Sequence, residues 1–205
     1  MKKYELTSET KIVFGHILYR IKALSSFGYV SAGDLGGFLE SEKNLSQNGN
    51  AWVSGNARVY GNAEVSGNAE VYGNAEVSGN AEVYGNARVS GSAEVSDNAR
   101  VYGNARVSGS AEVYGSARVS GNAEVSKIGS IFWIGAVGSR NDTATFFRCT
   151  DGVVRVTCGC FFGNLDEFAK KVRKTHGDND HAKVYMLAIE MAKIRIGDKK
   201  EKTEE

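Results

Sequence analysis

Histidine and cysteine are the side chains of this chain best suited to chemistry, and they lie outside its most regular part. The set consists of His16, His176, His181, Cys149, Cys158 and Cys160. Thiolate and imidazole groups that meet in a fold bind zinc or form a nucleophile–base pair. The cysteine spacing lacks the paired Cys-x2-Cys units of zinc fingers and ribbons. We therefore expect unreactive thiols with no metal or cofactor, while zinc binding by the five C-terminal members stays open.

One polar loop between two apolar segments is the other candidate site. Its hydrogen-bonding side chains are Ser139, Arg140, Asn141 and Asp142. Arginine and backbone N–H groups bind anions, whereas Asn and Asp also satisfy the turns in which they lie. We predict that this loop, together with His176, binds a ligand or partner. The alternative is a tight connection with no ligand.

The element before this loop is a sequence repeat. Between Ala51 and Ser126 the chain repeats Gly-Asn-Ala-(Glu/Arg)-Val-(Ser/Tyr), with valine at every sixth position from 53 to 125. Hexapeptide repeats are typical of β-helices. Valine and alanine are expected to point inward, and Gly-Asn to form the corner, because both residues tolerate left-handed backbone. Three sides close an 18-residue triangle, which predicts a single-stranded left-handed β-helix.

The tyrosines of the repeat leave the coil length open. Tyr60, Tyr72 and Tyr84 recur at every second hexad, whereas Tyr84 and Tyr102 are three hexads apart. An 18-residue coil stacks only Tyr84 on Tyr102, whereas a flattened 12-residue coil stacks the first three. If Tyr60, Tyr72 and Tyr84 are exposed on one side, they are the expected protein–protein interface.

Less regular segments flank the repeat. Residues 1–50 have the pattern of a β-rich head, with a strand at 19–23 and an irregular first coil that caps the solenoid. Residues 127–205 predict a compact α+β domain, with a strand at 131–134 and a hairpin that turns at Asp151-Gly152. The fold class is therefore mainly β: a left-handed β-helix over residues 51–126, a β-rich N-terminal cap and a small C-terminal α+β domain.

Two helices complete the C-terminal domain. The first follows a capping box of Asn164 and Glu167 and ends at Gly177. The second spans about residues 181–194 and has an apolar face at helical spacing. The charged segment 197–205 is expected to fray.

Both ends of the chain resemble parts of one group of proteins. The runs Ile21-Lys22-Ala23-Leu24, Gly33-Asp34-Leu35-Gly36-Gly37 and Gly49-Asn50-Ala51-Trp52-Val53 resemble the opening segment of bacterial and phage hexapeptide-repeat proteins of uncharacterised function, some labelled as transferases. The runs Cys158-Gly159-Cys160-Phe161 and Leu165-Asp166-Glu167-Phe168 resemble an uncharacterised domain that also follows pentapeptide repeats. At the level of the superfamily, the resemblance implies trimers and acyl transfer, but fold does not fix function.

Acyl transfer in that superfamily uses a histidine base on or beside the coils and a loop extruded from them. Residues 51–126 contain no histidine and no inserted loop, and a base must reach its substrate within hydrogen-bond distance. We therefore predict a non-enzymatic structural or interaction protein: a rigid scaffold with a C-terminal binding domain. The alternatives are an acyltransferase-like enzyme and a module that binds a small ligand or glycan.

Charge and hydropathy limit the partners. The 25 Lys and Arg nearly balance the 24 Asp and Glu, so no nucleic acid is expected. The sequence has no 18-residue apolar run and no signal-peptide pattern, so no membrane is expected, and the odd number of cysteines favours a reducing compartment. We expect a cytoplasmic homo-oligomer, most simply a trimer, that is bacterial or encoded by a phage. Its C-terminal domain would contact a protein or small-molecule partner.

Overall fold

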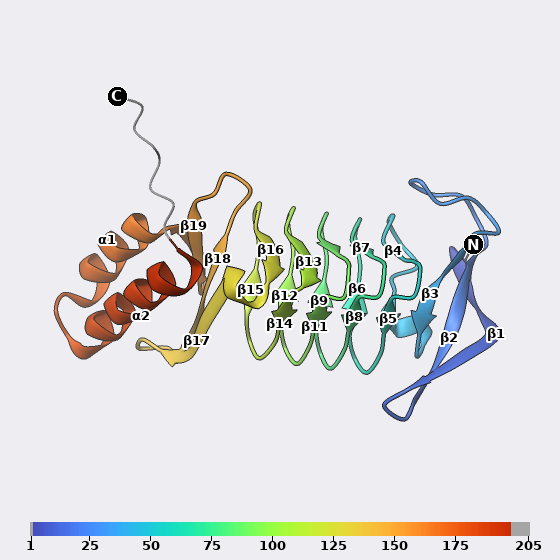
Figure 1. The fold of residues 1–205 in the computed structure, drawn as a ribbon, viewed down its shortest axis with the longest axis horizontal. Helices are drawn as coiled ribbons and strands as arrows, with labels where there is room; N and C mark the ends of the chain where they lie inside the picture. Colours follow the sequence, from blue (N-terminus) through green and yellow to red (C-terminus); the bar gives the residue numbers. More distant parts are fainter. Residues whose placement is uncertain (1, 198–205) are drawn as a thin grey trace.

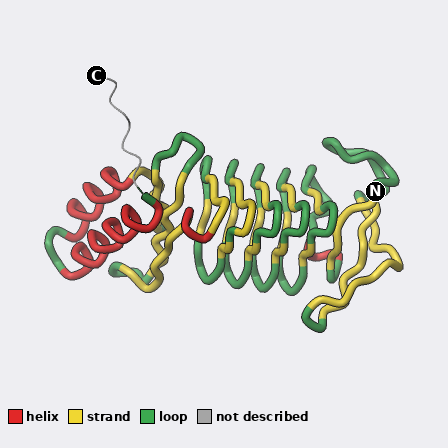
Figure 2. The backbone as a smooth tube through the Cα atoms, viewed as in Figure 1, coloured by secondary structure: helices red, strands yellow, loops and turns green. Residues whose placement is uncertain are grey.

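The computed structural model describes residues 2–197 of the chain. The protein is elongated, with a β-hairpin at one end, a stack of coils in the middle, and a small sheet covered by two helices at the other end (Figure 1, Figure 2). Of the charged segment expected to fray, residues 198–205 lie outside the described residues.

The middle of the molecule is a parallel β-solenoid with three sides. The first side carries β4 (Trp52–Val53), β7 (Glu70–Val71), β10 (Arg88–Val89), β13 (Arg106–Ser110) and β16 (Glu124–Lys127). The second side carries β5 (Arg58–Val59), β8 (Glu76–Val77), β11 (Glu94–Val95) and β14 (Glu112–Val113). The third side carries β6 (Glu64–Val65), β9 (Glu82–Val83), β12 (Arg100–Val101) and β15 (Arg118–Val119).

Each coil is three hexads long. Val59 pairs with Val77, and Val77 pairs with Val95, in continuous parallel register. The prediction of an 18-residue coil is therefore confirmed, and the 12-residue alternative is wrong. The rings of Tyr84 and Tyr102 stack at 5.0 Å with an interplanar angle of 3°, as an 18-residue coil requires.

The interior is filled by the valine and alanine of every repeat, which are at most 1% exposed from Ala51 to Val125. The corner before them favours glycine for two reasons, although Asp97, with a φ of +58°, takes this position once. Gly67 has a φ of +68°, and a Cβ there would lie 3.1 Å from the backbone nitrogen of Gly85 in the next coil. A side chain at this position would therefore be strained and would also push two coils apart.

The head extends the second side of the solenoid. It contains β1 (Tyr4–Val13), β2 (His16–Ala23), β3 (Leu35–Leu39) and the short 3-10 helix η1 (Glu42–Asn44). The strands β1 and β2 form an antiparallel hairpin, β2 pairs with β3, and β3 pairs in parallel with β5. The strand predicted at 19–23 is thus part of β2, whereas β1 was not predicted.

The head also supplies the hydrogen-bond donors that the backbone carbonyl groups of the first coil need. Within the array, each alanine carbonyl accepts from a backbone N–H of the preceding coil, as Ala69 does from Trp52 at 3.0 Å. The first coil has no regular coil before it. Its three alanine carbonyls accept from the head instead, each at 2.9 Å: Ala51 from Lys3 Nζ, Ala57 from the Phe38 N–H, and Ala63 from Asn44 Nδ2.

The C-terminal domain is a four-stranded antiparallel sheet with two helices among the described residues. Its elements are η2 (Ile128–Ser130), β17 (Ile131–Val137), β18 (Asp142–Arg148), β19 (Val154–Cys158), β20 (Phe161–Asn164), α1 (Leu165–His176) and α2 (Asp180–Ile196). The predicted strand, hairpin, capping box and helices are confirmed.

This sheet has one face on the solenoid and one on the helices. Phe147 and Ile131 join the core of the solenoid and close its last coil. Phe146, the residue before Phe147 on β18, belongs to the opposite face and packs with Val156 under α1 and α2. Alternation along a strand thus lets one sheet serve two cores.

Among residues 2–197, no helix has the length and apolar character needed to cross a lipid bilayer.

The buried Lys3 predicts a pH dependence of stability. Burial lowers the pKa of its ammonium group to about 8, whereas the unfolded chain keeps an ordinary lysine pKa of about 10.4. Between these values the unfolded state binds more protons at Lys3, so the contribution of Lys3 to the free energy of unfolding should rise from about pH 8 to about pH 10. Buried groups with a raised pKa, such as Cys158 and Tyr185, act in the opposite direction in both proteins. Urea unfolding of the wild type and Lys3→Met, followed by circular dichroism, checks this. The free energy of the wild type minus that of Lys3→Met should rise over this range, and a constant difference would contradict it.

Candidate functional site

The loop between β17 and β18 is a tight turn held under α2. The Asn141 N–H donates to the Gly138 carbonyl at 3.3 Å, and both residues have positive φ. A Cβ on Gly138 would collide with the hydroxyl of Tyr185 from α2. Glycine at this position therefore lets the loop pass beneath the helix and holds Ser139 and Arg140 at its edge.

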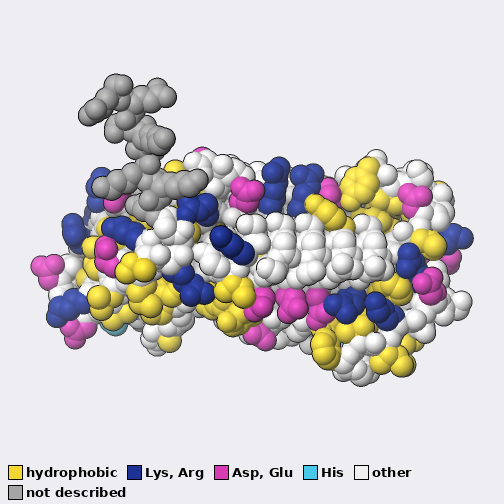
Figure 3. Space-filling model, in the orientation of Figure 1, with side chains coloured by type: hydrophobic (Ala, Val, Ile, Leu, Met, Phe, Trp, Pro, Cys, Tyr) yellow, Lys and Arg dark blue, Asp and Glu magenta, His cyan; other side chains and the backbone are white. Residues whose placement is uncertain are grey.

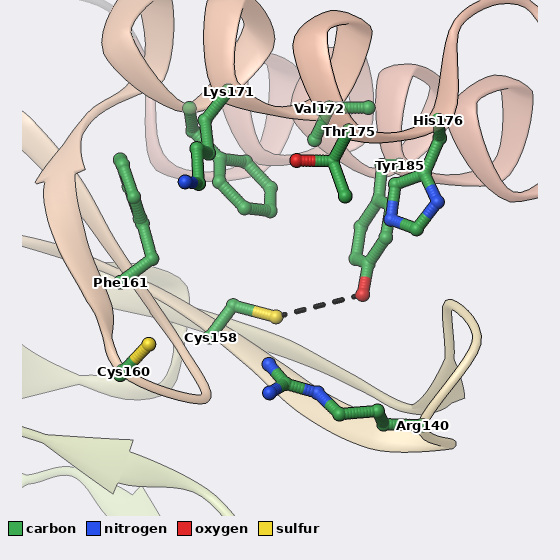
Figure 4. A pocket seen from close by; sticks show the side chains of 10 residues that line it. Arg140, Cys158, Cys160, Phe161, Lys171, Val172, Thr175, His176 and Tyr185 are labelled. Atoms are coloured by element: carbon green, nitrogen blue, oxygen red, sulfur yellow. Dashed lines mark hydrogen bonds between the residues drawn. The ribbon is translucent and has the colours of Figure 1, made fainter.

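A pocket lies between this loop, the turn from β19 to β20, and the two helices (Figure 4). Its inner cavity, which is itself half open to solvent, has a volume of about 110 Å³. It is lined by Arg140, Cys158, Cys160, Phe161, Phe168, Lys171, Val172, Thr175, His176 and Tyr185. An outer space of about 350 Å³ shares most of these residues and adds Ser139.

The pocket combines an apolar interior with a basic rim. Phe168 and Val172 are buried side chains of α1, whereas Arg140 and Lys171 are exposed. Neither Arg140 nor Lys171 has a hydrogen bond or an ion pair to any residue between 2 and 197. The guanidinium of Arg140 instead packs against Gly159, where a Cβ would lie 2.5 Å from Nη2. Two cationic groups therefore face one pocket without an ion pair in the described part of the chain, although the Asp142 carboxylate also lies close to Gly159.

The floor of the pocket is polar but uncharged. The Cys158 Sγ and the Tyr185 hydroxyl are 3.6 Å apart, and the hydroxyl donates to the Val137 carbonyl at 3.4 Å. Burial raises the pKa of the Cys158 thiol and also that of the Tyr185 hydroxyl. Both groups stay protonated near neutral pH, which disfavours Cys158 as a nucleophile because the thiolate is the reactive form.

The structure brings together part of the predicted site. Ser139, Arg140 and His176 line the same pocket, although His176 is distant in sequence. Asn141 and Asp142 do not line it. Asn141 forms the turn, and the Asp142 carboxylate accepts from the Thr143 N–H at 2.8 Å and lies 3.9 Å from Arg118.

Several lining residues were not predicted. Lys171 and Thr175 lie four residues apart on α1, with Phe168 one turn earlier on the same face. The spacing of three and four residues places them together, and this signal was available in the sequence. Tyr185 and Phe161 come from other elements, and only the fold brings them to the pocket.

The cysteines and histidines do not form one cluster. Cys149 belongs to the solenoid core, Cys158 lines the pocket, and the His176 ring lies 5.6 Å from that of His181. No group of three or more potential ligands in the described part of the chain is arranged to hold a metal. His16 lies in the head, where its Nδ1 is 2.8 Å from Glu40.

The predicted tyrosine interface needs correction. In an 18-residue coil, positions two hexads apart fall on different sides, so Tyr60, Tyr72 and Tyr84 follow β5, β7 and β9 on three sides. Tyr60 is buried under the head and donates its hydroxyl to Glu76. Tyr72 is exposed, and Tyr84 stacks on the next coil. The three residues therefore form no common surface.

The loop geometry predicts an unequal cost of two glycine substitutions. Gly138 and Gly152 both have positive φ, but only Gly138 has atoms within 4 Å of an added Cβ. Gly138→Ala should therefore be less stable than Gly152→Ala by about 1–3 kcal/mol, the usual cost of overpacking. Urea unfolding of both variants measures the difference. Equal losses would show that Tyr185 yields freely and that the pocket is not held by this contact.

Comparison with known proteins identifies the repeat. Four segments match the family model described as the YdcK beta solenoid repeat, over residues 51–67, 81–97, 93–109 and 99–115. A search of curated proteins finds no match. The matched segments lie within the stacked coils, and together these findings identify a repeat β-solenoid protein.

Proposed function

We propose that this chain is a non-enzymatic scaffold, in which the solenoid holds a C-terminal binding domain at a fixed distance from the head. The unbroken 18-residue register from β4 to β16 carries this proposal. Such a register makes a rod in which every coil contacts only its neighbours. The hexad period carries the finer expectation that the coil is left-handed.

The outer side chains of the rod support a spacer function because many of them bind one another. Side-chain amides form a ladder along one corner, with N···O distances of 3.0–3.3 Å, through Asn50, Asn68, Asn86, Asn104 and Asn122. Three ion pairs join equivalent positions of adjacent coils: Arg58–Glu76, Arg88–Glu70 and Arg100–Glu82. On the flank seen in Figure 3, regular rows of backbone and uncharged side chains run along the rod between charged side chains at its two edges.

An acyltransferase-like enzyme is the weaker candidate. The three histidines lie outside the coils, and His176 lies on α1, beyond the sheet that closes the solenoid. A base at that position would not act on a substrate bound between coils.

A rigid spacer predicts a narrow and adjustable distance between its ends. Spin labels on Asn48→Cys and on the exposed Cys160 should give a narrow distance distribution by electron–electron double resonance. Deleting residues 63–80 keeps the repeat in phase and removes one coil, so the distance should fall by about 5 Å, the spacing of adjacent strands. Deleting residues 81–98 is the matched control and should give the same change. A broad distribution, or no shortening, would contradict the spacer.

We also propose that the chain self-associates through α2, with a trimer as the expected assembly. One stripe of this helix leaves large apolar side chains exposed: Val184 at 40%, Leu187 at 65%, Met191 at 52% and Ile194 at 84%. Their 3-4-3 spacing is that of a coiled-coil seam. In a parallel pairing, Glu190 beside the stripe faces Arg195 of a second copy, five residues further along. Within one chain Glu190 pairs with Lys193 at 2.9 Å and Arg195 donates to the Ile131 carbonyl at 3.4 Å, so the contact between copies would share these groups. This charge complementarity favours a second copy of the chain as the occupant.

Sedimentation velocity tests this interface. The wild type should sediment as an oligomer, and Leu187→Glu should sediment as a monomer because it buries a charge in the seam. Ile12→Glu is the matched control, since Ile12 is 73% exposed in the head, and it should leave the assembly unchanged. A monomeric wild type, or an oligomer that survives Leu187→Glu, would overturn the proposal.

The expected cytoplasmic location stays part of the proposal. The cysteines Cys149, Cys158 and Cys160 are all free thiols, which suits a reducing compartment.

A further inference from the structure

We propose that the pocket beside Arg140 binds a short organic anion, with its carboxylate at the basic rim and an alkyl chain of about four carbon atoms in the inner cavity. This inference rests on the proposed binding role of the C-terminal domain and names its ligand class.

The rim selects the charge of the ligand. Arg140 approaches from the loop and Lys171 from α1, on opposite sides of the mouth (Figure 4). Thr175 and His176 add a hydroxyl and an imidazole on the next turn of α1. The nearest carboxylate of the loop, Asp142, does not line the pocket and forms no ion pair with Arg140 within the described residues. Cations paired with no carboxylate favour an anion and repel a metal ion.

The interior selects the body of the ligand. Phe161, Phe168 and Val172 supply aromatic and aliphatic walls. The Cys158 thiol is already engaged in a hydrogen bond with the Tyr185 hydroxyl. Few polar groups are left to recognise the hydroxyls of a sugar. An apolar chain gains free energy by leaving water for such a wall.

The volume limits the size of the ligand. An engineered apolar cavity of about 150 Å³ binds benzene, which has six carbon atoms. The inner cavity, at about 110 Å³, is smaller and half open to solvent, so by the same scale it seats about four carbon atoms of a chain. A nucleotide or a long fatty acid would leave most of its atoms outside it. Pentanoate, a carboxylate with a four-carbon chain, matches both the cavity and the rim.

Titrations of the full chain, followed by ¹H–¹⁵N NMR, test the proposal with three probes. Pentanoate should shift the amides of the loop at Ser139 and Arg140 and of α1 at Lys171 and Thr175, in a saturable manner. Acetate has the same charge without the chain, and pentylammonium has the chain with the opposite charge, so both should bind at least about tenfold more weakly. Equal binding of pentanoate and pentylammonium would overturn the role of the rim, and equal binding of acetate would overturn that of the cavity.

Two variants complete the test. Arg140→Gln combined with Lys171→Gln should weaken pentanoate binding by about tenfold or more, since each removes a charge-assisted hydrogen bond. Lys170→Gln combined with Lys174→Gln is the matched control, because it removes two charges from α1 at residues that do not line the pocket, and it should change nothing. If the control weakened pentanoate binding as much as the Arg140 and Lys171 double variant does, the overall charge of the protein would explain the effect and the inference would be overturned.

The two proposals fail separately. Loss of pentanoate binding in a chain that keeps its narrow end-to-end distance would reject only the ligand. Saturable binding in a chain with a broad distance distribution would reject only the rigid spacer.

Discussion

The backbone hydrogen bond between a residue and the one that precedes its equivalent in the next coil, such as Trp52 N–H to the Ala69 carbonyl, constrains the whole molecule. Because the coils stack in register, the interior receives columns of valine and alanine, and each corner brings two backbones close together. Glycine at the corner follows from this contact, as Gly67 against Gly85 illustrates. The outer polar side chains are also placed one strand spacing from an identical or opposite neighbour, which is why asparagine amides and Arg–Glu pairs form ladders.

The same stacking leaves backbone hydrogen-bonding groups and an open core at each end of the solenoid, where no further coil covers them. At the N-terminal end, Lys3, Phe38 and Asn44 donate to carbonyl groups that an earlier coil would otherwise serve. At the C-terminal end, the Arg118 N–H donates to the Thr145 hydroxyl at 3.0 Å, and Phe147 covers the open core. Buried backbone groups without partners are costly. The head and the terminal sheet are therefore needed for stability as well as for contacts.

The terminal sheet links this requirement to the pocket. Its solenoid face is fixed by the last coil, because the Thr157 hydroxyl of β19 lies 3.3 Å from that of Ser120 and Phe162 of β20 packs against Gly121. The strands that carry Cys158 and Phe161 are therefore anchored from behind. The helices then cover the opposite face and bring Lys171 and Tyr185 over the loop. A site built on anchored strands needs little ordering when a ligand binds, which favours affinity.

Local patterns predicted the elements well, and the assembled surfaces less well. The six-residue period and the Asn164–Glu167 capping box depend on neighbours in sequence, so the solenoid and α1 could be placed before the structure was known. The side on which a tyrosine lies depends on coil length, and the sequence left both the two-hexad and the three-hexad coil open. Tyr60 shows the second reason, because the side chains that bury it come from three separate strands of the head. Similarly, Arg140 and His176 were predicted, but Tyr185 reaches the pocket only through the packing of α2 on the sheet.

The three-sided coil makes the rod behave as a screw thread, in which length and direction change together. One hexad advances the chain by about a third of the strand spacing, or about 1.6 Å, and turns it by about 120°. A gain or loss of one or two hexads preserves the stacking of valine and alanine yet rotates the terminal domain to a new direction around the axis of the rod. Only a change of three hexads alters the length of the rod without rotating the terminal domain. Variation in repeat number would therefore move such a protein through three discrete orientations of its end.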